Sequence, residues 1–379
     1  MSAQNSEVSA AACSVIMEHT GQFEDVLNAY EVDLGQLPAD KILVEMLVSS
    51  VNPSDKMRVL GMYPSAQGKE FNLVSSTGPK TVNGSIIGLE GVGKVIKVGS
   101  SVSQAINDTV SVGDWVIPLD FSSYGSWSSK VILSPMAVVV VKNKKGLTPH
   151  SLCSTKVNGL TAYRMLLDIV KLEKGDYVIQ NGANSGVGQY LIQFAKLFGY
   201  KTINVIRNRP DYDETVTFLK DLGADLVVKD TDLDSKDTKK LFESLPGKIR
   251  LAINCVGGKA ADSLAASLAD GGTMATYGAM TLDPITTPSP SFIFKDIHLC
   301  GYWLNWFFEK NTVPQWMETW NHIFDLLRDG SIKAQASKYI DMFDVVDDQE
   351  VIVGADKFKS RLMQAINSKE KTGLRFSRL

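Results

Sequence analysis

The glycine-rich segment Gly182-Ala-Asn-Ser-Gly-Val-Gly188 has residue types and a spacing that suit the binding of a phosphate group. A buried strand is expected before it, at 177–180, and an apolar helix after it, at 187–198. In that setting, glycines let backbone N–H groups and a helix N-terminus approach the pyrophosphate of a dinucleotide. The pattern predicts a dinucleotide-binding turn, with a purely structural glycine turn as the alternative.

The strand expected at 202–206 is followed by Arg207, Asn208 and Arg209. NAD sites usually carry Asp or Glu at this point, where the carboxylate bonds the ribose 2′-hydroxyl. Arginine instead offers planar and permanently charged recognition of a phosphate. The sequence therefore favours NADPH over NADH, unless both arginines are solvated loop charges.

Tyr63 is the candidate proton donor of the chain. It lies in Gly61-Met-Tyr-Pro-Ser65, shortly after Asn52-Pro-Ser-Asp55. Because the reference pKa of tyrosine is about 10, the side chain can donate a proton while it is neutral at pH 7. Packing in a core is the alternative role.

Other kinds of catalytic site are not indicated. The segment 88–95 nearly matches a P-loop, but Val95 stands where that motif needs a magnesium-binding Ser or Thr. The four histidines show no metal-ligand spacing, and no Gly-x-Ser-x-Gly elbow occurs. ATP, zinc and serine-hydrolase chemistry are therefore not expected.

The composition is that of an ordinary folded protein. The 379 residues are 44% hydrophobic and 21% charged, which predicts two or three domains. A net charge of −3 gives no overall attraction to nucleic acid or to anionic lipid, and we expect neither a nucleic-acid partner nor a membrane span. The four cysteines lack paired spacing, so a reducing compartment fits.

The pattern of expected secondary structure changes near residue 160. Before it, β-rich runs such as 41–48 and 86–98 are broken by glycines. After it, helical patterns over 159–170 and 213–222 alternate with strands, which predicts parallel strands with helical crossovers. Strands are further expected at 225–228 and 251–254, and an amphipathic helix at 314–328.

Eight motifs, in order along the chain, resemble those of the mitochondrial trans-2-enoyl thioester reductases. These enzymes form a zinc-free branch of the medium-chain dehydrogenase/reductase superfamily, and the resemblance runs from about residue 41 to 310. The motifs are Asn52-Pro-Ser-Asp55, Gly61-Met-Tyr63-Pro64, Gly88-Leu-Glu-Gly91, Gly113-Asp-Trp-Val-Ile-Pro118, Val157-Asn158-Gly-Leu-Thr-Ala-Tyr163, Gln180-Asn-Gly-Ala-Asn-Ser-Gly-Val-Gly188, Arg207-Asn-Arg-Pro210 and Asn254-Cys-Val-Gly-Gly-Lys259.

The resemblance implies an α/β fold with a GroES-like, β-rich catalytic domain and a Rossmann domain with a doubly wound parallel sheet. The catalytic domain would comprise 1–153 and 311–379, and the NADPH-binding domain 154–310. It also implies a homodimer and a mitochondrial location, with a cytoplasmic location as the alternative. Residues 1–14 contain Glu7 and no Arg, so a mitochondrial presequence is expected to be absent, cryptic or already removed.

The resemblance also implies roles for individual residues. Tyr63 would be the catalytic proton donor, and Asn158 would contact the nicotinamide end of the cofactor. The remaining roles fall to short segments that would hold the pyrophosphate (Asn184, Ser185, Gly186, Val187), hold the 2′-phosphate (Arg207, Asn208, Arg209), wall the nicotinamide and the substrate entrance (Tyr277, Gly278, Ala279, Met280, Tyr302, Trp303, Leu304) or contact the cofactor from the C-terminal segment (Lys371).

The implied reaction is the NADPH-dependent reduction of the 2,3 double bond of trans-2-enoyl-CoA or enoyl acyl-carrier protein, for fatty acid synthesis. Hydride goes to the β carbon, and Tyr63 protonates the α carbon. A zinc-free quinone or enone oxidoreductase and a non-catalytic NADPH-binding protein are the alternatives. Aromatic side chains are candidates to line the apolar acyl pocket or, equally, to belong to ordinary core: Trp127, Trp303, Trp306, Phe307 and Phe308.

The sequence departs from the family pattern at several positions. Leu89 stands where the family usually has Asn, Ala279 replaces a second glycine after Tyr277, and Lys56-Met57 replaces Ile-Asn. The segment 66–84 is longer than usual and would reshape the acyl entrance. We expect these departures to affect the preferred length of the acyl chain more than the type of reaction.

Overall fold

The computed structural model describes residues 11–63, 68–119 and 125–378. Two compact units divide the chain. The first comprises Met1–Lys156 with Ala336–Leu379, and the second comprises Val157–Gln335. The domain boundaries after residues 153 and 310 remain a prediction, and the second compact unit extends to Gln335.

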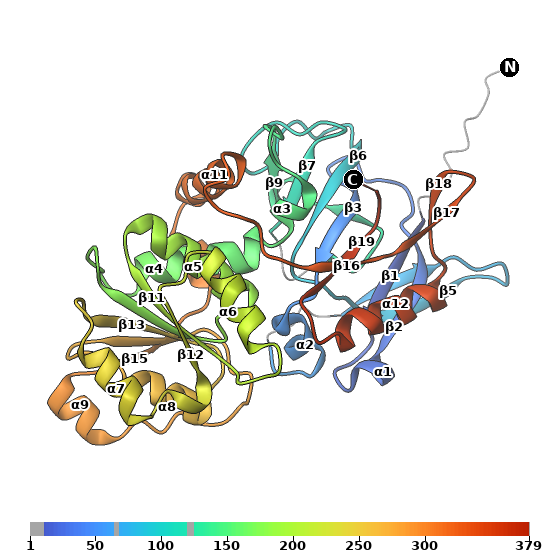
Figure 1. Cartoon of the computed structure of the whole chain (residues 1–379). Helices are drawn as coiled ribbons and strands as arrows, with labels where there is room; N and C mark the ends of the chain where they lie inside the picture. The colour runs from blue at the N-terminus through green and yellow to red at the C-terminus, as the bar shows by residue number, and fades with distance from the viewer. Residues whose placement is uncertain (1–10, 64–67, 120–124, 379) are drawn as a thin grey trace, which may run out of the picture. The chain divides into compact units, whose positions relative to one another are not determined.

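The first unit is built mainly from strands (Figure 1). One sheet has the order β16-β19-β3-β6-β7-β9, with β8 also paired to β3, and β1-β2-β4-β5 form a closed barrel. The sheet joins segments from the N-terminal and C-terminal parts of the chain, because β19 pairs with β3. The strands are β1 (Ala11–Met17), β2 (Leu27–Asp33), β3 (Ile42–Ser50), β4 (Lys69–Leu73), β5 (Lys80–Ile86), β6 (Gly91–Val98), β7 (Trp115–Pro118), β8 (Lys130–Leu133), β9 (Val138–Val141), β16 (Lys338–Asp341), β17 (Phe343–Val346), β18 (Gln349–Ile352) and β19 (Thr372–Arg375).

The helices of this unit are short apart from the last. Helix α12 contributes Phe358, Leu362 and Ile366 to the same apolar cluster as the buried faces of β1, β3 and β6. The pair β17-β18 forms a separate hairpin. The helices are α1 (Phe23–Val26), α2 (Pro53–Val59), α3 (Pro149–Cys153) and α12 (Ala355–Asn367).

The second unit contains a sheet whose pairs are all parallel, in the order β12-β11-β10-β13-β14-β15. Numbered along the chain, this is the 3-2-1-4-5-6 order of a doubly wound dinucleotide-binding fold. The doubly wound sheet expected from the alternating pattern is therefore confirmed. The strands are β10 (Tyr177–Asn181), β11 (Lys201–Ile206), β12 (Leu226–Lys229), β13 (Ile249–Asn254), β14 (Thr273–Thr276) and β15 (His298–Gly301).

Helices pack on both faces of this sheet (Figure 1). Side chains of α5 and α6 form one apolar cluster with Ile206, whereas α8 packs with strand residues such as Ile179 and Ala252 in another. The helices are α4 (Leu160–Asp168), α5 (Gly186–Phe198), α6 (Tyr212–Asp221), α7 (Lys236–Glu243), α8 (Gly258–Ala266), α9 (Ser289–Lys295), α10 (Asn305–Lys310) and α11 (Val313–Arg328). The helices expected at 159–170, 187–198, 213–222 and 314–328 are confirmed within one or two residues at each end.

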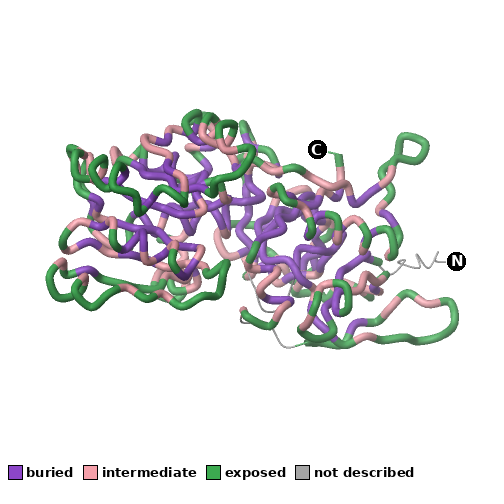
Figure 2. Tube along the Cα trace, turned by 60° about the horizontal axis from the view of Figure 1, so that its bottom comes forward, coloured by how far each residue is buried: buried purple, intermediate pink, exposed green. Residues whose placement is uncertain are grey.

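Buried segments run through the interior of each unit, as the purple stretches in Figure 2 show. All five residues of β10 are buried, because helices cover both faces of the sheet. Its last two residues are nevertheless polar. Gln180 Nε2 donates to Asn204 Oδ1 at 2.8 Å, and Asn181 Nδ2 donates to Asn254 Oδ1 at 2.8 Å. These amides connect β11, β10 and β13 near their carboxyl ends, where ligands of such sheets bind.

None of the described helices is both long and apolar enough to cross a membrane.

Candidate active site

The glycine-rich turn joins β10 to α5 and brings the start of the helix close to the sheet. Gly182 has a positive φ of +59°, and a Cβ atom there would lie 2.7 Å from the Sγ atom of Cys255. A Cβ atom on Gly188 would lie 2.3 Å from the carbonyl oxygen of Ala183. The Oγ atom of Ser185 accepts from Gly188 N at 3.2 Å and caps the helix. The amides of Gly186 and Val187 lie in the first turn, where a helix offers its N–H groups and the positive end of its dipole to an anion.

Asn158 lies against this helix start. It belongs to a π-helical turn, Thr155–Gly159, an irregularity that is common at functional sites, and it is 5% exposed. A Cβ atom on Gly186 would lie 2.9 Å from Asn158 Cγ and 1.9 Å from Gln335 Oε1. Gln335 therefore shares the surroundings of Asn158, although no sequence motif marked it. Only the absence of a side chain at Gly186 lets both amides approach.

The segment from Arg207 to Arg209 follows β11, next to the glycine-rich turn in the strand order. All three residues are exposed, and Asn208 N donates to Asp230 Oδ1 at 3.1 Å. The two guanidinium groups therefore stand on a tethered backbone at the carboxyl end of a central strand. This arrangement fits the 2′-phosphate of NADPH, because β11 ends without the carboxylate that a 2′-hydroxyl would need.

Two more predicted segments follow the neighbouring strands. Tyr277 N donates to Asn254 O at 3.0 Å, so residues 277–280 continue directly from β14. Tyr302 N donates to Thr276 O at 2.9 Å, so residues 302–304 continue from β15. Four of the segments predicted to bind the cofactor thus lie at the carboxyl edge of one sheet. Burial raises the pKa of both tyrosine hydroxyls, which keeps them neutral at physiological pH.

Tyr63 in the first unit follows helix α2 through a tight helical end. Gly61 has a φ of +75°, and Met62 N donates to Met57 O at 2.8 Å. Tyr63 is partly buried, whereas Pro64 and Ser65 of the same motif lie outside the described residues. The position of the candidate acid therefore depends on how α2 is held.

Buried polar groups hold the start of α2. Asn52 N donates to Asp55 Oδ2 at 2.7 Å, and Leu89 N donates to Asp55 Oδ1 at 2.8 Å. The side chain of Asn52 links two charges, because its Nδ2 donates to Glu90 Oε2 at 2.9 Å and its Oδ1 accepts from Lys371 Nζ at 2.6 Å. Asp55 and Glu90 are both fully buried. The Asn52-Pro-Ser-Asp55 motif is thus a helix cap that is joined to a buried ion network.

Lys371 is bonded within this network. Besides Asn52 Oδ1, its Nζ donates to Val51 O at 3.4 Å. Burial lowers its pKa, and the charges of Glu90 and Asp55 oppose that shift. Its role as a cofactor-binding residue remains a prediction. In the first unit it acts as a partner of the cap that begins α2.

Leu89 and the segment 66–84 are two of the departures from the family pattern. Leu89 is 3% exposed and contributes its backbone, since its N–H group donates to Asp55 and its carbonyl accepts from Lys156 Nζ at 3.1 Å. The described part of the long segment 66–84 forms most of the β4-β5 hairpin, while 66 and 67 lie outside the described residues. Its influence on the acyl entrance stays a prediction.

The aromatic candidates for the acyl pocket differ in burial. Trp127 belongs to the core of the first unit, where it is 0% exposed and donates from Nε1 to Ser50 O at 3.1 Å. In the second unit, Phe307 is buried, whereas Trp306 is 41% exposed and makes an edge contact with Trp303. Phe308 packs against Trp316 and Trp320. The structure favours a role in the core for Trp127.

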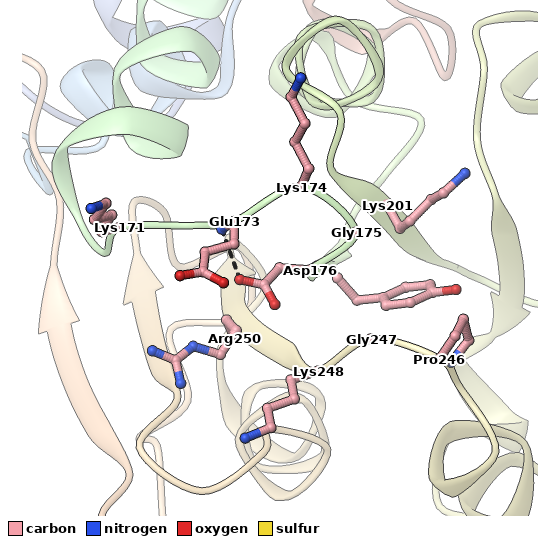
Figure 3. A pocket seen from close by; sticks show the side chains of 11 residues that line it. Lys171, Glu173, Lys174, Gly175, Asp176, Lys201, Pro246, Gly247, Lys248 and Arg250 are labelled. Atoms are coloured by element: carbon pink, nitrogen blue, oxygen red, sulfur yellow. Dashed lines mark hydrogen bonds between the residues drawn. The ribbon is translucent and has the colours of Figure 1, made fainter.

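A cavity of about 470 Å³ lies in the second unit at the opposite edge of the sheet, where β10, β11 and β13 begin (Figure 3). The carboxylates of Glu173 and Asp176 project toward Arg250, whereas Lys174 and Lys201 point away from the centre. Ligands of doubly wound sheets bind at the carboxyl edge, so we do not assign the cofactor here.

Similarity to known proteins shows to which family the chain belongs. The chain is 39% identical over 323 residues to the mitochondrial enoyl-[acyl-carrier-protein] reductase of Rattus norvegicus, which covers 85% of this chain and 80% of that protein. The chain belongs to the mitochondrial enoyl-[acyl-carrier-protein] reductase family. The resemblance inferred from the eight motifs is therefore confirmed.

Solved structures extend the comparison for this reductase family. A complex of Etr1p with NADP and crotonyl-CoA has a TM-score of 0.84 at 31% identity and covers 97% of this chain and 100% of its own. The Etr1p/Etr2p heterodimer of Candida tropicalis, a mitochondrial 2-enoyl thioester reductase, has a TM-score of 0.83 at 32% identity, with the same coverage. The predicted α/β fold class, with a GroES-like and a Rossmann part, is confirmed.

A broader family, the zinc-binding dehydrogenases, matches residues 186–321. Within residues 11–63, 68–119 and 125–378, no group of three or more His, Cys, Asp or Glu side chains is placed to hold a metal ion. The matched region is the one that begins at the first turn of α5, so the similarity concerns the dinucleotide-binding part of the chain.

The buried carboxyl of Asp55 gives a pH-dependent prediction. Burial raises its pKa to about 6, although the N–H groups of Asn52 and Leu89 and the charge of Lys371 oppose the shift. An unfolded Asp titrates at about 3.9. Between these two values the folded protein keeps a proton that the unfolded chain releases. The contribution of this carboxyl to stability is therefore complete below a pH of about 4 and is lost as the pH rises through 6.

We expect a ¹³C NMR titration of aspartate carboxyls to contain one signal with a midpoint near 6 that disappears in Asp55→Asn. Asp344 is the matched control, because hydrogen bonds from Lys357 and Arg361 lower its pKa. A signal of Asp55 that titrates below the ordinary aspartate value would show that the hydrogen bonds outweigh burial.

Proposed function

We propose that the chain catalyses the NADPH-dependent reduction of the 2,3 double bond of trans-2-enoyl thioesters. The observation that carries the proposal is its family membership, together with the tyrosine that the family motif provides at Tyr63. An enoyl group carried by CoA or by an acyl-carrier protein would be the substrate. Names of the relatives support both carriers, since one solved relative is a crotonyl-CoA complex and the curated relatives are named for the acyl-carrier protein.

The proposed NADPH site lies at the carboxyl edge of the second unit's sheet. The amides of Gly186 and Val187 would bind the pyrophosphate, and Arg207 and Arg209 the 2′-phosphate. Asn158 would contact the nicotinamide end, next to Gly186. The Etr1p complex with NADP supports this choice of cofactor. Residues 277–280 and 302–304 would wall the nicotinamide.

Bound NADPH supplies a hydride to the β carbon of the enoyl group. The residues of this chain would supply the proton. Tyr63 carries that proton on Oη at neutral pH, because an ordinary tyrosine titrates at about 10. The cap on α2 would hold the tyrosine in place, so that its hydroxyl is oriented before the substrate binds. Proton delivery to the α carbon completes the reduction.

The setting of the reaction is inferred from the relatives. They are named mitochondrial enoyl-[acyl-carrier-protein] reductases, which supports a mitochondrial location and a part in fatty acid synthesis for this chain. Both inferences come from the names of the relatives and not from individual residues of this chain.

A homodimer is the assembly that we propose. Strand β15 ends the sheet and is exposed at all four residues, and its outer edge pairs with no other strand of the described chain. Helix α9, just before it, exposes Ile293 at 70% and Phe294 at 79%. An open strand edge beside exposed apolar side chains favours pairing with a second copy about a two-fold axis. The Etr1p/Etr2p heterodimer supports a dimeric assembly.

The proton donor is tested with Tyr63→Phe, which removes only the hydroxyl. We expect reduction of crotonyl-CoA, followed by loss of NADPH absorbance, to fall at least about a hundredfold, as for the loss of a general acid. Binding of NADPH should be unchanged, and NADH serves as the control for cofactor choice.

Strong activity that persists in Tyr63→Phe would contradict this assignment of the acid but keep the reductase. A wild-type protein that binds NADPH without reducing any enoyl thioester would contradict the proposed function. A quinone assay would then separate a quinone reductase from a silent binding protein.

The dimer is tested with Phe294→Glu, which puts a charge into the exposed apolar group. We expect sedimentation velocity to give a dimer for the wild type and a monomer for Phe294→Glu, because a buried unpaired charge is costly. Val346→Glu, at a residue of the first unit that is 53% exposed, is the control and should stay dimeric. An unchanged mass for Phe294→Glu would exclude this edge as the interface.

A further inference from the structure

Arg164 on helix α4 brings together three helices of the second unit. Its Nε atom donates to Asp168 Oδ2 at 3.0 Å, and one of its terminal nitrogens donates to the other oxygen of the same carboxylate. The other terminal nitrogen donates to Thr319 Oγ1 on α11 at 3.4 Å. The Cζ atom of the guanidinium lies over the ring of Phe307 on α10, 4.5 Å from the ring centre. One side chain therefore joins α4, α10 and α11.

The ion pair of Arg164 and Asp168 orients the guanidinium and contributes little to the helix itself. The two residues are four positions apart, with the cation first, which is the less favourable order in a helix. Asp168 is also the last residue of α4, where the helix dipole disfavours a negative charge. Two hydrogen bonds to one carboxylate nevertheless hold the guanidinium in one orientation over the ring of Phe307.

Phe307 connects the guanidinium to the segment 302–304, which is proposed to wall the nicotinamide. Phe307 is 4% exposed and lies near the start of α10. Its N–H group donates to Leu304 O at 2.9 Å, and the N–H group of Trp306 donates to Trp303 O at 3.0 Å. The last two residues of the segment are thus hydrogen-bonded to the helix that the guanidinium contacts.

Helix α4 also follows the other contact that is proposed for the nicotinamide end. It begins directly after the π-helical turn that contains Asn158. The segment 302–304 is bonded to the sheet at its first residue, since Tyr302 N donates to Thr276 O at 2.9 Å, whereas its last residues are bonded to α10. Arg164 therefore joins the helix that follows Asn158 to the helix that follows the segment 302–304.

We propose that Arg164 is a positioning residue for the nicotinamide end of the NADPH site and acts through Phe307 on the segment 302–304. The proposal rests on the NADPH site described under the proposed function. Loss of the guanidinium should displace one wall of the nicotinamide, while the contacts proposed for the pyrophosphate and the 2′-phosphate stay in place. NADPH should therefore still bind. Hydride transfer should become slower, because it depends on how the reacting groups are oriented.

The test compares Arg164→Met with the wild type, because methionine keeps the apolar stem and removes the guanidinium. The readout is the rate at which bound NADPH reduces crotonyl-CoA in a single turnover. We expect this rate to fall at least about tenfold, since a small displacement of the reacting groups is costly. The dissociation constant of NADPH, measured by its fluorescence, should change little. Bound NADPH also counts the folded sites, so a loss of folded protein does not lower the rate per site.

Arg375→Met is the matched control. Arg375 likewise donates to an aspartate, Asp341, through two nitrogens and lies over a phenylalanine ring, that of Phe343. It belongs to β19 in the first unit and has no role in the proposed sites. We expect Arg375→Met to lower the unfolding temperature and to leave the single-turnover rate per bound NADPH unchanged.

A double-mutant cycle tests the path through Phe307. Phe307→Leu keeps an apolar side chain in the core and removes the ring that the guanidinium contacts. It should lower the single-turnover rate by a similar factor, even where Arg164→Met folds poorly. Together the two changes should cost no more than the larger of them, whereas independent effects would multiply to about a hundredfold.

Three results would overturn the inference. They are an unchanged rate per bound NADPH in Arg164→Met, an equal loss of rate in Arg375→Met, and effects that multiply in the cycle. A wild type that binds NADPH but reduces no enoyl thioester would instead contradict the proposed function, and this distinguishes the two failures.

Discussion

The organisation of the second unit depends on how closely helix α5 approaches the sheet. At Gly182, Gly186 and Gly188, a Cβ atom would lie 2.7, 1.9 and 2.3 Å from its nearest neighbour, far inside van der Waals contact. The missing side chains let the helix start beside β10, with its first amides at the edge where the parallel strands end. These backbone amides can bind a negatively charged ligand. Because they belong to the backbone, movement of side chains does not displace them.

In the first unit, buried polar groups hold a short helix that precedes the candidate acid. Helix α2 has only seven residues and is not stable by itself. Its cap is joined to the buried charges of Asp55, Glu90 and Lys371 through the amide of Asn52. Buried charges are costly unless they are paired and hydrogen-bonded, so such a network specifies one arrangement of α2. Tyr63 follows the end of this helix by a few residues.

Much of the fold could be predicted because its signals are local. The alternation of 3.6-residue and buried-strand patterns after residue 160 gave the doubly wound sheet, and the family motifs gave the fold class. The positions of Gln335 and Cys255 could not be predicted, because their contacts with Gly186 and Gly182 join segments far apart in the chain. The capping role of Asp55 was readable from Asn52-Pro-Ser-Asp55, but its bond to Leu89 was not. Trp127 shows the limit of composition, since a large aromatic residue serves a core as readily as a pocket.

In the reaction that we propose, hydride goes from NADPH to the β carbon of an enoyl thioester and a proton goes to its α carbon. The most direct measurement uses NADPH that carries deuterium at the transferable C4 position, with crotonyl-CoA in ordinary water. We expect NMR to show butyryl-CoA with one deuterium at the β carbon and none at the α carbon. Deuterium at the α carbon, or no saturated product while NADPH is bound, would contradict it.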